Sequence, residues 1–189
     1  RKMSHLLSFW GKTDGTGAKT FAKPVIHHLL DVAAVAFVLM REQPTFARRI
    51  AAQLQIAPDR VAPLCAFLAG LHDLGKISVP FQAKSPPHWP QEVLGPLPQS
   101  IFDRSHWKYS ALLLLHETIR RDLTRLLPSM AQLNRLIATI AGHHGVPPSQ
   151  KIMTETAFGL LRAELPQACI AAATEAFAVL ERQTGMRPM

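Results

Sequence analysis

The sequence predicts an all-α fold from three observations. Apolar residues recur at helical spacing in almost every segment, prolines and glycines fall between these segments, and no segment alternates apolar and polar residues like a half-buried strand. A chain of 189 residues that is 48% hydrophobic can bury one substantial core, and its length suits a single domain. We therefore expect one helical domain over residues 1–189.

The first two expected helices each follow a proline. Pro24 suits a first helical turn, and the apolar spacing after it predicts a helix to about residue 41 that carries His28 near its start. A second helix is expected after Pro44. Successive helical positions point in different directions, so we expect His27 to point away from any site that includes His28.

The middle of the chain is expected to form one helix and then an irregular crossing. Apolar spacing predicts a helix over about 59–74, with His72-Asp73 on its last turn and Gly75 placed for a left-handed C-terminal cap. Residues 85–100 contain five prolines and cannot form a regular helix. We expect this crossing to border a functional site.

Helical spacing resumes in the last part of the chain. It predicts a helix over about 106–127, and a further helix that Ser129 caps and that extends to about His144. Two more helices are expected, at about 150–164 and 167–183, because a proline separates two apolar segments there.

Charge and cysteine content narrow the function classes. A net charge of +8 and a pI near 10.1 favour a polyanionic partner such as nucleic acid. Cys65 and Cys169 lack the C-x-x-C spacing of redox and metal motifs, so each is expected to be a buried reduced thiol. No apolar run reaches the roughly 18 residues that span a bilayer, and the apolar stretch at residues 6–10 is too short for a signal-peptide core. We expect a cytoplasmic protein with no membrane partner.

Histidines at separated points of the chain indicate a metal site. His72-Asp73 lies within the run Leu71–Lys76, and His28, His106 and the pair His143-His144 fall near the ends of other expected helices. A single His-Asp pair is usually a hydrogen-bonded part of a core, but four such segments can converge on one cleft. Imidazole suits Mn, Fe, Co, Ni and Zn, whereas Mg prefers carboxylates and water, so a transition metal is expected.

Three other features allow two interpretations each. Lys76 can stabilise charge on a phosphate oxygen, or it can be a solvated lysine at a helix end. Asp31 can orient a metal ligand or form a surface ion pair. The arginines of the 106–127 segment can follow a DNA backbone or form a solvated basic face.

Several motifs, taken together, resemble a known family. In chain order they are Trp10-Gly11-Lys12-Thr13, His28-Leu29-Leu30-Asp31-Val32-Ala33-Ala34, Leu71-His72-Asp73-Leu74-Gly75-Lys76 with Phe81-Gln82-Ala83-Lys84-Ser85, and Gly142-His143-His144-Gly145. The His-Asp-x-Gly-Lys string alone would indicate only the wider HD phosphohydrolase superfamily. In this order and spacing, from about residue 5 to 150, the motifs resemble the HD nuclease domain of Cas3, the nuclease-helicase of type I CRISPR systems.

The resemblance implies an HD-domain helical bundle with a metal cleft that binds two divalent transition-metal ions. In the family's pattern the ligands form two sets: His28, His72, Asp73 and a late Asp for one metal, and His106, His143 and His144 for the other. Asp73 would bridge the two metals, because each of its oxygens can bind one. Asp73 and Lys76 would be the catalytic residues.

The resemblance also implies a nuclease that cuts single-stranded DNA during CRISPR interference. Two metals would activate water and stabilise charge on the phosphoryl oxygens. The substrate would be the strand displaced when a Cascade-type guide-RNA surveillance complex opens its target. A helicase domain or subunit would deliver that strand.

Two features of the family are missing from the sequence. The HD domain of Cas3 ends with a Ser/Ala-Asp-Trp segment whose Asp completes the first metal site, but no such string follows Gly145, and Asp122 is the last aspartate. No G-x-x-x-x-G-K-[S/T] string is present to bind nucleotide phosphates, so the helicase is expected elsewhere. Either the chain is cut before the Asp-bearing segment or that segment has diverged, and of the two we expect an HD domain truncated before its last metal ligand.

The residues leave two other functions open. An HD phosphohydrolase could act on a nucleotide or cyclic dinucleotide, and a pocket closed around one base would then replace an open basic groove. A non-cutting docking domain could keep a purely structural metal, and no nucleic acid would then be cleaved.

Overall fold

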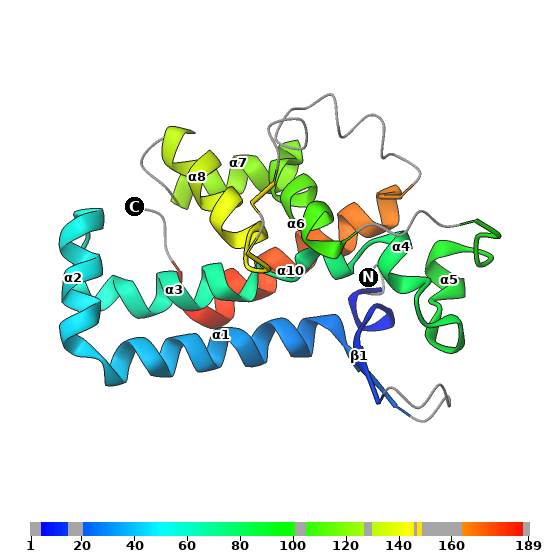
Figure 1. The fold of residues 1–189 in the computed structure, drawn as a ribbon, viewed down its shortest axis with the longest axis horizontal. Helices are drawn as coiled ribbons and strands as arrows, with labels where there is room; N and C mark the ends of the chain where they lie inside the picture. The colour runs from blue at the N-terminus through cyan, green and yellow to red at the C-terminus, as the bar shows by residue number, and fades with distance from the viewer. Residues whose placement is uncertain are drawn as a thin grey trace.

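The computed structural model describes residues 5–14, 21–100, 105–126, 130–145, 147–148 and 164–186. Most of these residues are helical, and the regular structure that remains among them is one two-stranded sheet (Figure 1). The predicted all-α fold is confirmed. No helix in the described ranges is long and apolar enough to cross a membrane.

Three helices pack against one another (Figure 1): α1 (Val25–Glu42), α3 (Val61–Gly70) and α10 (Gln167–Thr184). Their contact is apolar, with Leu29, Phe67 and Phe177 almost fully buried. The rings of Phe67 and Phe177 meet edge to face, with 5.1 Å between their centroids. The helices predicted after Pro24 and at 167–183 are confirmed.

A further helix, α2 (Pro44–Leu54), joins the far ends of α1 and α3 (Figure 1). Pro44 is its first residue, as predicted, because proline has no N–H to lose there. Gln55 ends it in the left-handed conformation, with φ 55°. A short 3-10 turn, η2 (Pro58–Arg60), then leads into α3.

A second group of helices consists of α6 (His106–Leu115), α7 (Glu117–Leu126) and α8 (Met130–Ala141). The prediction of one continuous helix over 106–127 is wrong, because the chain turns at His116 (φ −59°, ψ 136°). Residues 109–114 are all buried, so apolar spacing in α6 marks no single face and does not reveal the break. Ser129 and the helix predicted at 150–164 lie outside the described residues.

The two-stranded sheet is absent from the sequence prediction. Strand β1 (Trp10–Thr13), which follows the turn η1 (Leu6–Ser8), pairs antiparallel with β2 (Ala22–Pro24). Strands of four and three residues are too short to show alternation. The backbone N–H of Val25 donates to the carbonyl of Phe9 at 2.8 Å, which attaches the sheet to the start of α1.

Short helical turns follow α3: η3 (Leu74–Lys76), α4 (Val79–Gln82), η4 (Pro86–His88) and α5 (Gln91–Leu94). The helix predicted over 59–74 therefore ends early, at Gly70. The segment 85–100 has single helical turns but no long helix, in agreement with its five prolines.

Neither cysteine forms a disulfide. Cys169 is buried, and burial raises the pKa of its thiol to about 12. Cys65 is only partly buried, and burial raises the pKa of its thiol as well. Cys169 is therefore the buried thiol that was predicted, whereas Cys65 is less buried than predicted.

Candidate metal centre

His28 enters the site from the first turn of α1. Its side chain is buried, and its Nε2 lies 2.8 Å from Oδ2 of Asp73. Strand β1 lies against this turn at Gly11, where a Cβ would be 2.8 Å from Cα of Val25 and 3.4 Å from Cβ of His28. Glycine therefore permits the close approach. The neighbouring His27 is exposed, in agreement with its predicted direction.

His72 and Asp73 lie in the turn between α3 and η3. Nδ1 of His72 donates to the carbonyl oxygen of Ala69 at 2.7 Å, so the neutral ring carries its hydrogen on Nδ1. Its Nε2 lone pair then points to the site, 3.1 Å from Oδ2 of Asp73. This tautomer is the one that can bind a metal through Nε2.

The turn after α8 contributes the last two histidines. Nδ1 of His143 donates to the carbonyl of Ile140 at 2.9 Å, and its Nε2 lies 3.3 Å from Oδ1 of Asp73. His144 places its Nε2 3.2 Å from Nε2 of His106, the first residue of α6. Nε2 of His106 is itself 2.9 Å from Oδ1 of Asp73. The structure thus brings together all six residues that the sequence indicated, from four segments.

The candidate ligand atoms divide into two groups, and within each group all of them lie within 4.8 Å of one another. The first cluster is His28, His72 and Asp73, and the second cluster is Asp73, His106, His143 and His144. Oδ2 of Asp73 faces the first cluster and Oδ1 faces the second. A single carboxylate is therefore common to both.

Asp73 is an ionised carboxylate in a buried position. Burial opposes its charge, but short contacts with histidines, chiefly His106 and His28, outweigh burial and hold its pKa below the usual range. Nζ of Lys76 also lies 2.8 Å from Oδ2, and Lys76 is only 8% exposed.

The surroundings of Oδ1 of Asp73 fit a metal ion. This buried oxygen accepts no well-aligned hydrogen bond, although Nε2 of His106 is only 2.9 Å away. A buried polar atom without a partner is costly. The Nε2 atoms of His106 and His144 also lie 3.2 Å apart, close enough for both to bind one cation through their lone pairs. A divalent cation among these atoms would satisfy all of them, and the imidazole-rich set suits a transition metal.

Comparison with known proteins agrees with this geometry. A family model described as the HD domain of Cas3 matches residues 10–187. The chain belongs to this family. It is 33% identical over 144 residues to the CRISPR-associated endonuclease/helicase Cas3 of Thermus thermophilus. The matched region is 75% of this chain but only 15% of that protein.

Solved structures share the fold. The chain is similar to the Thermus thermophilus Cas3 HD domain crystallised in the presence of Ni²⁺, with a TM-score of 0.64 and 27% identity over 96% of this chain and 66% of that one. It also has the fold of a chain from a CRISPR RNA-guided surveillance complex in a pre-nicking state. There the TM-score is 0.69 and the identity 24%, over 97% of this chain and 21% of that chain.

Two residues of this Cas3 HD domain have roles that the sequence did not reveal. Gly75 was expected as a left-handed cap, which is wrong because its φ is not positive. Glycine is needed because a Cβ there would lie 1.9 Å from the carbonyl oxygen of His106. Oγ of Ser110 accepts from the N–H of Gly75 and donates to the carbonyl of His72, both at 2.9 Å. The spacing of Ser110, one turn after His106, is the signal that could have found it.

Asp31 does not belong to the metal centre. Nζ of Lys23 donates to its carboxylate, and the side chain of Asp31 is 60% exposed. Of its two interpretations, the surface ion pair is correct.

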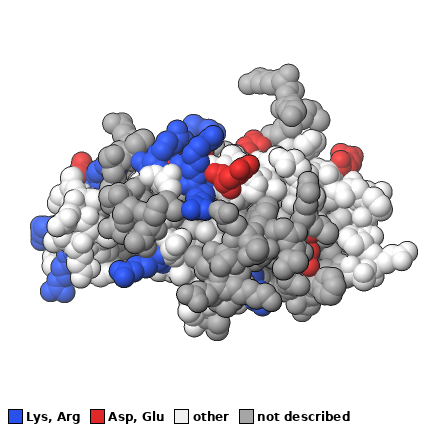
Figure 2. Space-filling model, turned by 90° about the horizontal axis from the view of Figure 1, so that it is seen from above, with Lys and Arg blue, Asp and Glu red and all other residues white. Residues whose placement is uncertain are grey.

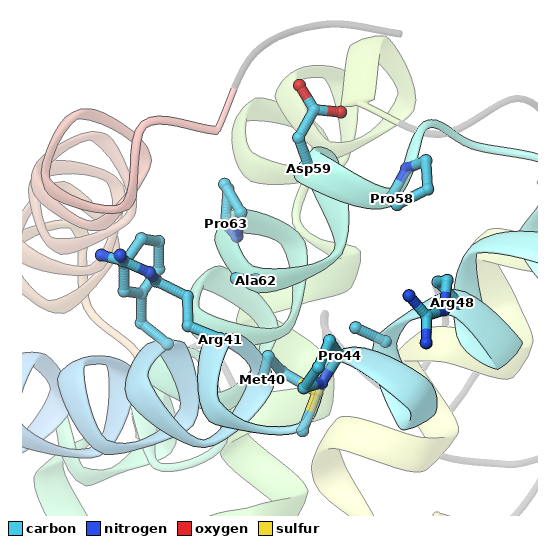
Figure 3. A pocket seen from close by; sticks show the side chains of 10 residues that line it. Met40, Arg41, Pro44, Arg48, Pro58, Asp59, Ala62 and Pro63 are labelled. Atoms are coloured by element: carbon cyan, nitrogen blue, oxygen red, sulfur yellow. The ribbon is translucent and has the colours of Figure 1, made fainter.

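A separate pocket of about 490 Å³ lies near the other end of α1 (Figure 3). Its walls come from α1, α2, η2 and α3, and they combine apolar side chains such as Met40 with the charged Arg41, Arg48 and Asp59. None of its lining residues is a histidine or belongs to either cluster. The pocket is therefore not the metal centre.

Basic side chains gather on the face that Figure 2 shows from above. Helix α7 carries Arg120, Arg121 and Arg125 near the top of Figure 1. Asp122 accepts from Nη2 of Arg125 at 2.7 Å and from Nε of Arg121 at 3.5 Å, so these two arginines share one carboxylate. An excess of positive charge attracts polyanions without sequence preference.

Proposed function

We propose that this Cas3 HD domain is a metal-dependent deoxyribonuclease that cleaves single-stranded DNA. The observation that carries the proposal is the carboxylate of Asp73, whose two oxygens face two different sets of imidazole nitrogens. Such a carboxylate can bridge two divalent ions, and a pair of ions is a common arrangement for hydrolysing phosphodiesters.

The two clusters would each hold one ion. The first would use His28, His72 and Asp73, and the second Asp73, His106, His143 and His144. When bound, such ions lower the pKa of a coordinated water and offset charge on the phosphoryl oxygens. The imidazole content favours Mn, Fe, Co or Ni over Mg, and a related HD domain was crystallised in the presence of Ni²⁺.

Asp73 and Lys76 are the residues that we assign to catalysis. Asp73 is held ionised by its surroundings and would orient the ligands on both sides. Nζ of Lys76 balances that charge at 2.8 Å, and it can turn from Oδ2 to a nearby phosphate oxygen when DNA binds. Its burial limits hydration and strengthens such a contact.

The substrate and partners follow from charge and from the relatives. The net charge of +8 and the arginines of α7 support a polyanionic substrate. The Thermus thermophilus relative is an endonuclease/helicase, so we infer that a helicase domain or subunit supplies the single strand. We further infer that a Cascade-type surveillance complex opens the target, in the cytoplasm.

A cleavage assay tests the proposal against its alternatives. The protein is incubated with Mn²⁺, Co²⁺ or Ni²⁺ and with single-stranded DNA, duplex DNA or a cyclic dinucleotide. Preferential cutting of single-stranded DNA is expected. Hydrolysis of the dinucleotide alone would support a nucleotide phosphohydrolase, whereas bound metal without turnover, even with the helicase present, would support a docking domain.

The two clusters should differ in affinity. The first has three protein ligands among the described residues and the second has four, and a metal with fewer protein ligands keeps more exchangeable water. We therefore expect the second cluster of this 189-residue chain to bind Mn²⁺, Co²⁺ or Ni²⁺ more tightly. Calorimetric counting of bound equivalents checks this, and two equally tight sites would contradict it.

A further inference from the structure

Gln82 is a buried amide between β1 and η3, and each of these elements adjoins a segment that carries a metal ligand. It is 0% exposed. Its Oε1 accepts from the backbone N–H of Trp10 at 3.1 Å, and its Nε2 donates to the carbonyls of Trp10 and Lys76, each at 2.8 Å. Both amide hydrogens and the amide oxygen are therefore used. Through these bonds one side chain connects β1 to η3.

The Trp10 end of this connection leads to His28. Gln82 pairs with both backbone groups of Trp10, much as a neighbouring strand would. The next residue, Gly11, lies directly against the first turn of α1, close to Cβ of His28. The position of β1 therefore affects where the first turn of α1, and the imidazole on it, can lie.

The Lys76 end leads to Asp73. The backbone N–H of Lys76 donates to the carbonyl of Asp73 at 2.9 Å, and Nζ of Lys76 lies 2.8 Å from its Oδ2. The main chain and the side chain of Lys76 thus both contact Asp73. Gln82 holds the carbonyl of the same Lys76 residue.

Resting on the proposed metal centre, we propose that Gln82 is a positioning residue of the first cluster. Its amide sets the separation of His28, on α1, from Asp73, in the turn after α3. Without the amide, the backbone groups of Trp10 and Lys76 would be buried without partners, and water or a shift of the segments would have to satisfy them. Either change loosens the ligand geometry that a metal requires.

The effect should be confined to the first cluster. Near the second cluster, Oγ of Ser110 on α6 forms hydrogen bonds with the carbonyl of His72 and the N–H of Gly75. His106 lies on the same helix. These bonds do not involve Gln82. The second cluster therefore has its own support.

The backbone of Gln82 is itself held by Trp10. The indole Nε1–H of Trp10 donates to the carbonyl of Gln82 at 3.1 Å, and the indole packs on the ring of Phe81 with 4.6 Å between centroids. Replacing Trp10 by phenylalanine removes this one hydrogen bond and keeps an aromatic ring. Trp10→Phe is therefore a milder probe of the same connection.

Calorimetric Mn²⁺ titration of the 189-residue chain tests the role, with circular dichroism to check the fold. Gln82→Leu removes the amide, and Gln82→Glu keeps its shape but places an oxygen opposite two carbonyls. We expect both to weaken Mn²⁺ binding at the first cluster about 10-fold. In a His28→Ala background, which reports the second cluster, neither should change the affinity. Leu123→Ala is the matched control, because it removes buried packing in α7 without touching these bonds.

Each outcome separates the role of Gln82 from the proposed function. If the wild-type chain binds no Mn²⁺, Co²⁺ or Ni²⁺, the metal centre itself is wrong. If it binds metal and both Gln82 variants bind equally well, only the positioning role is overturned. If the Leu123→Ala variant loses as much Mn²⁺ affinity as the Gln82 variants, the cause is general destabilisation and the role is also overturned. The same conclusion follows if the Gln82 variants lose as much affinity in the His28→Ala background as in the wild type. If the Gln82 variants do not fold, Trp10→Phe decides, with an expected loss of about 3-fold and unchanged affinity as the contrary result.

Discussion

The two ends of α1 have opposite surroundings. At its start, His28 is buried and contacts a charged carboxylate. In its second half, Val35, Val38 and Leu39 are 60%, 55% and 53% exposed. The pocket of Figure 3 lies at this second end. One helix therefore buries a polar residue, His28, and exposes several apolar ones.

Apolar residues are usually buried and polar residues usually exposed, so the buried His28 at the start of α1 marks the candidate site. Burying a charge or an imidazole costs free energy unless partners compensate. At the start of α1 the partner of His28 is Asp73, which His106 and His143 from two further segments also contact. The pocket at the other end is hollow, but its charged residues Arg41 and Asp59 are exposed to water. Burial of polar groups, rather than the presence of a pocket, therefore identifies the site in this protein.

Removal of a carboxylate should have the largest effect, and only at one end. Asp73→Ala removes the candidate bridge and is expected to abolish metal binding and cleavage of single-stranded DNA. Asp59→Ala, at the pocket, should leave both unchanged, because Asp59 is exposed and belongs to neither cluster. Metal analysis and a nuclease assay on the two variants measure the contrast. Cleavage that survives Asp73→Ala in a preparation free of other nucleases would disprove the mechanism.

Two adjacent histidines offer a finer contrast. His28→Ala should lower metal affinity at the first cluster by about 10- to 100-fold, because Nε2 of His28 contacts Asp73. His27→Ala should not change it, since His27 is exposed on the same turn. Calorimetric titration with Co²⁺ or Ni²⁺ compares them. Equal losses would mean that the helix start, and not the ligand, matters.

The stability of the metal-free chain should fall in mild acid. Burial lowers the pKa of His143, and the bond from its Nδ1 to Ile140 only partly offsets this. Below the usual histidine pKa of about 6.5, the unfolded chain binds this proton more readily than the folded chain does. The free energy of unfolding should therefore decrease as the pH falls through this range.

A variant isolates the contribution of His143. Urea unfolding is measured between pH 7.5 and pH 5 for the wild type and for His143→Gln, with metal chelated. The variant should lose less stability on acidification than the wild type. Identical pH dependence would show that His143 titrates alike in both states.

The smallest effect is expected at the exposed end of α1. Val38→Ser with Leu39→Gln should change the free energy of unfolding by only about 0.5 kcal/mol per site and should leave metal affinity unchanged. Thermal unfolding and Ni²⁺ titration measure both quantities. A loss of metal binding would mean that the two ends of α1 are coupled and do not act independently.

The sequence by itself determined most of the helices and the chemical type of the site. Apolar spacing is a local property, so it predicted α1, α2 and α10, each of which has one apolar face or a proline at its start. It did not reveal the break at His116, because residues 109–114, which lead up to it in α6, are buried on all sides. The histidines and Asp73 indicated a metal site because their side chains are typical metal ligands, whatever the fold.

Only the tertiary structure decided how those residues meet. Asp73 contacts His28 across 45 residues of sequence, and Gln82 bonds to Trp10 across 72. Gly75 is required by the approach of α6, which no local pattern contains. The two carboxylate oxygens of Asp73 face different clusters for the same reason, because distant segments pack on either side of it. Such contacts depend on the packing of distant segments, and periodicity carries information only about neighbours along the chain.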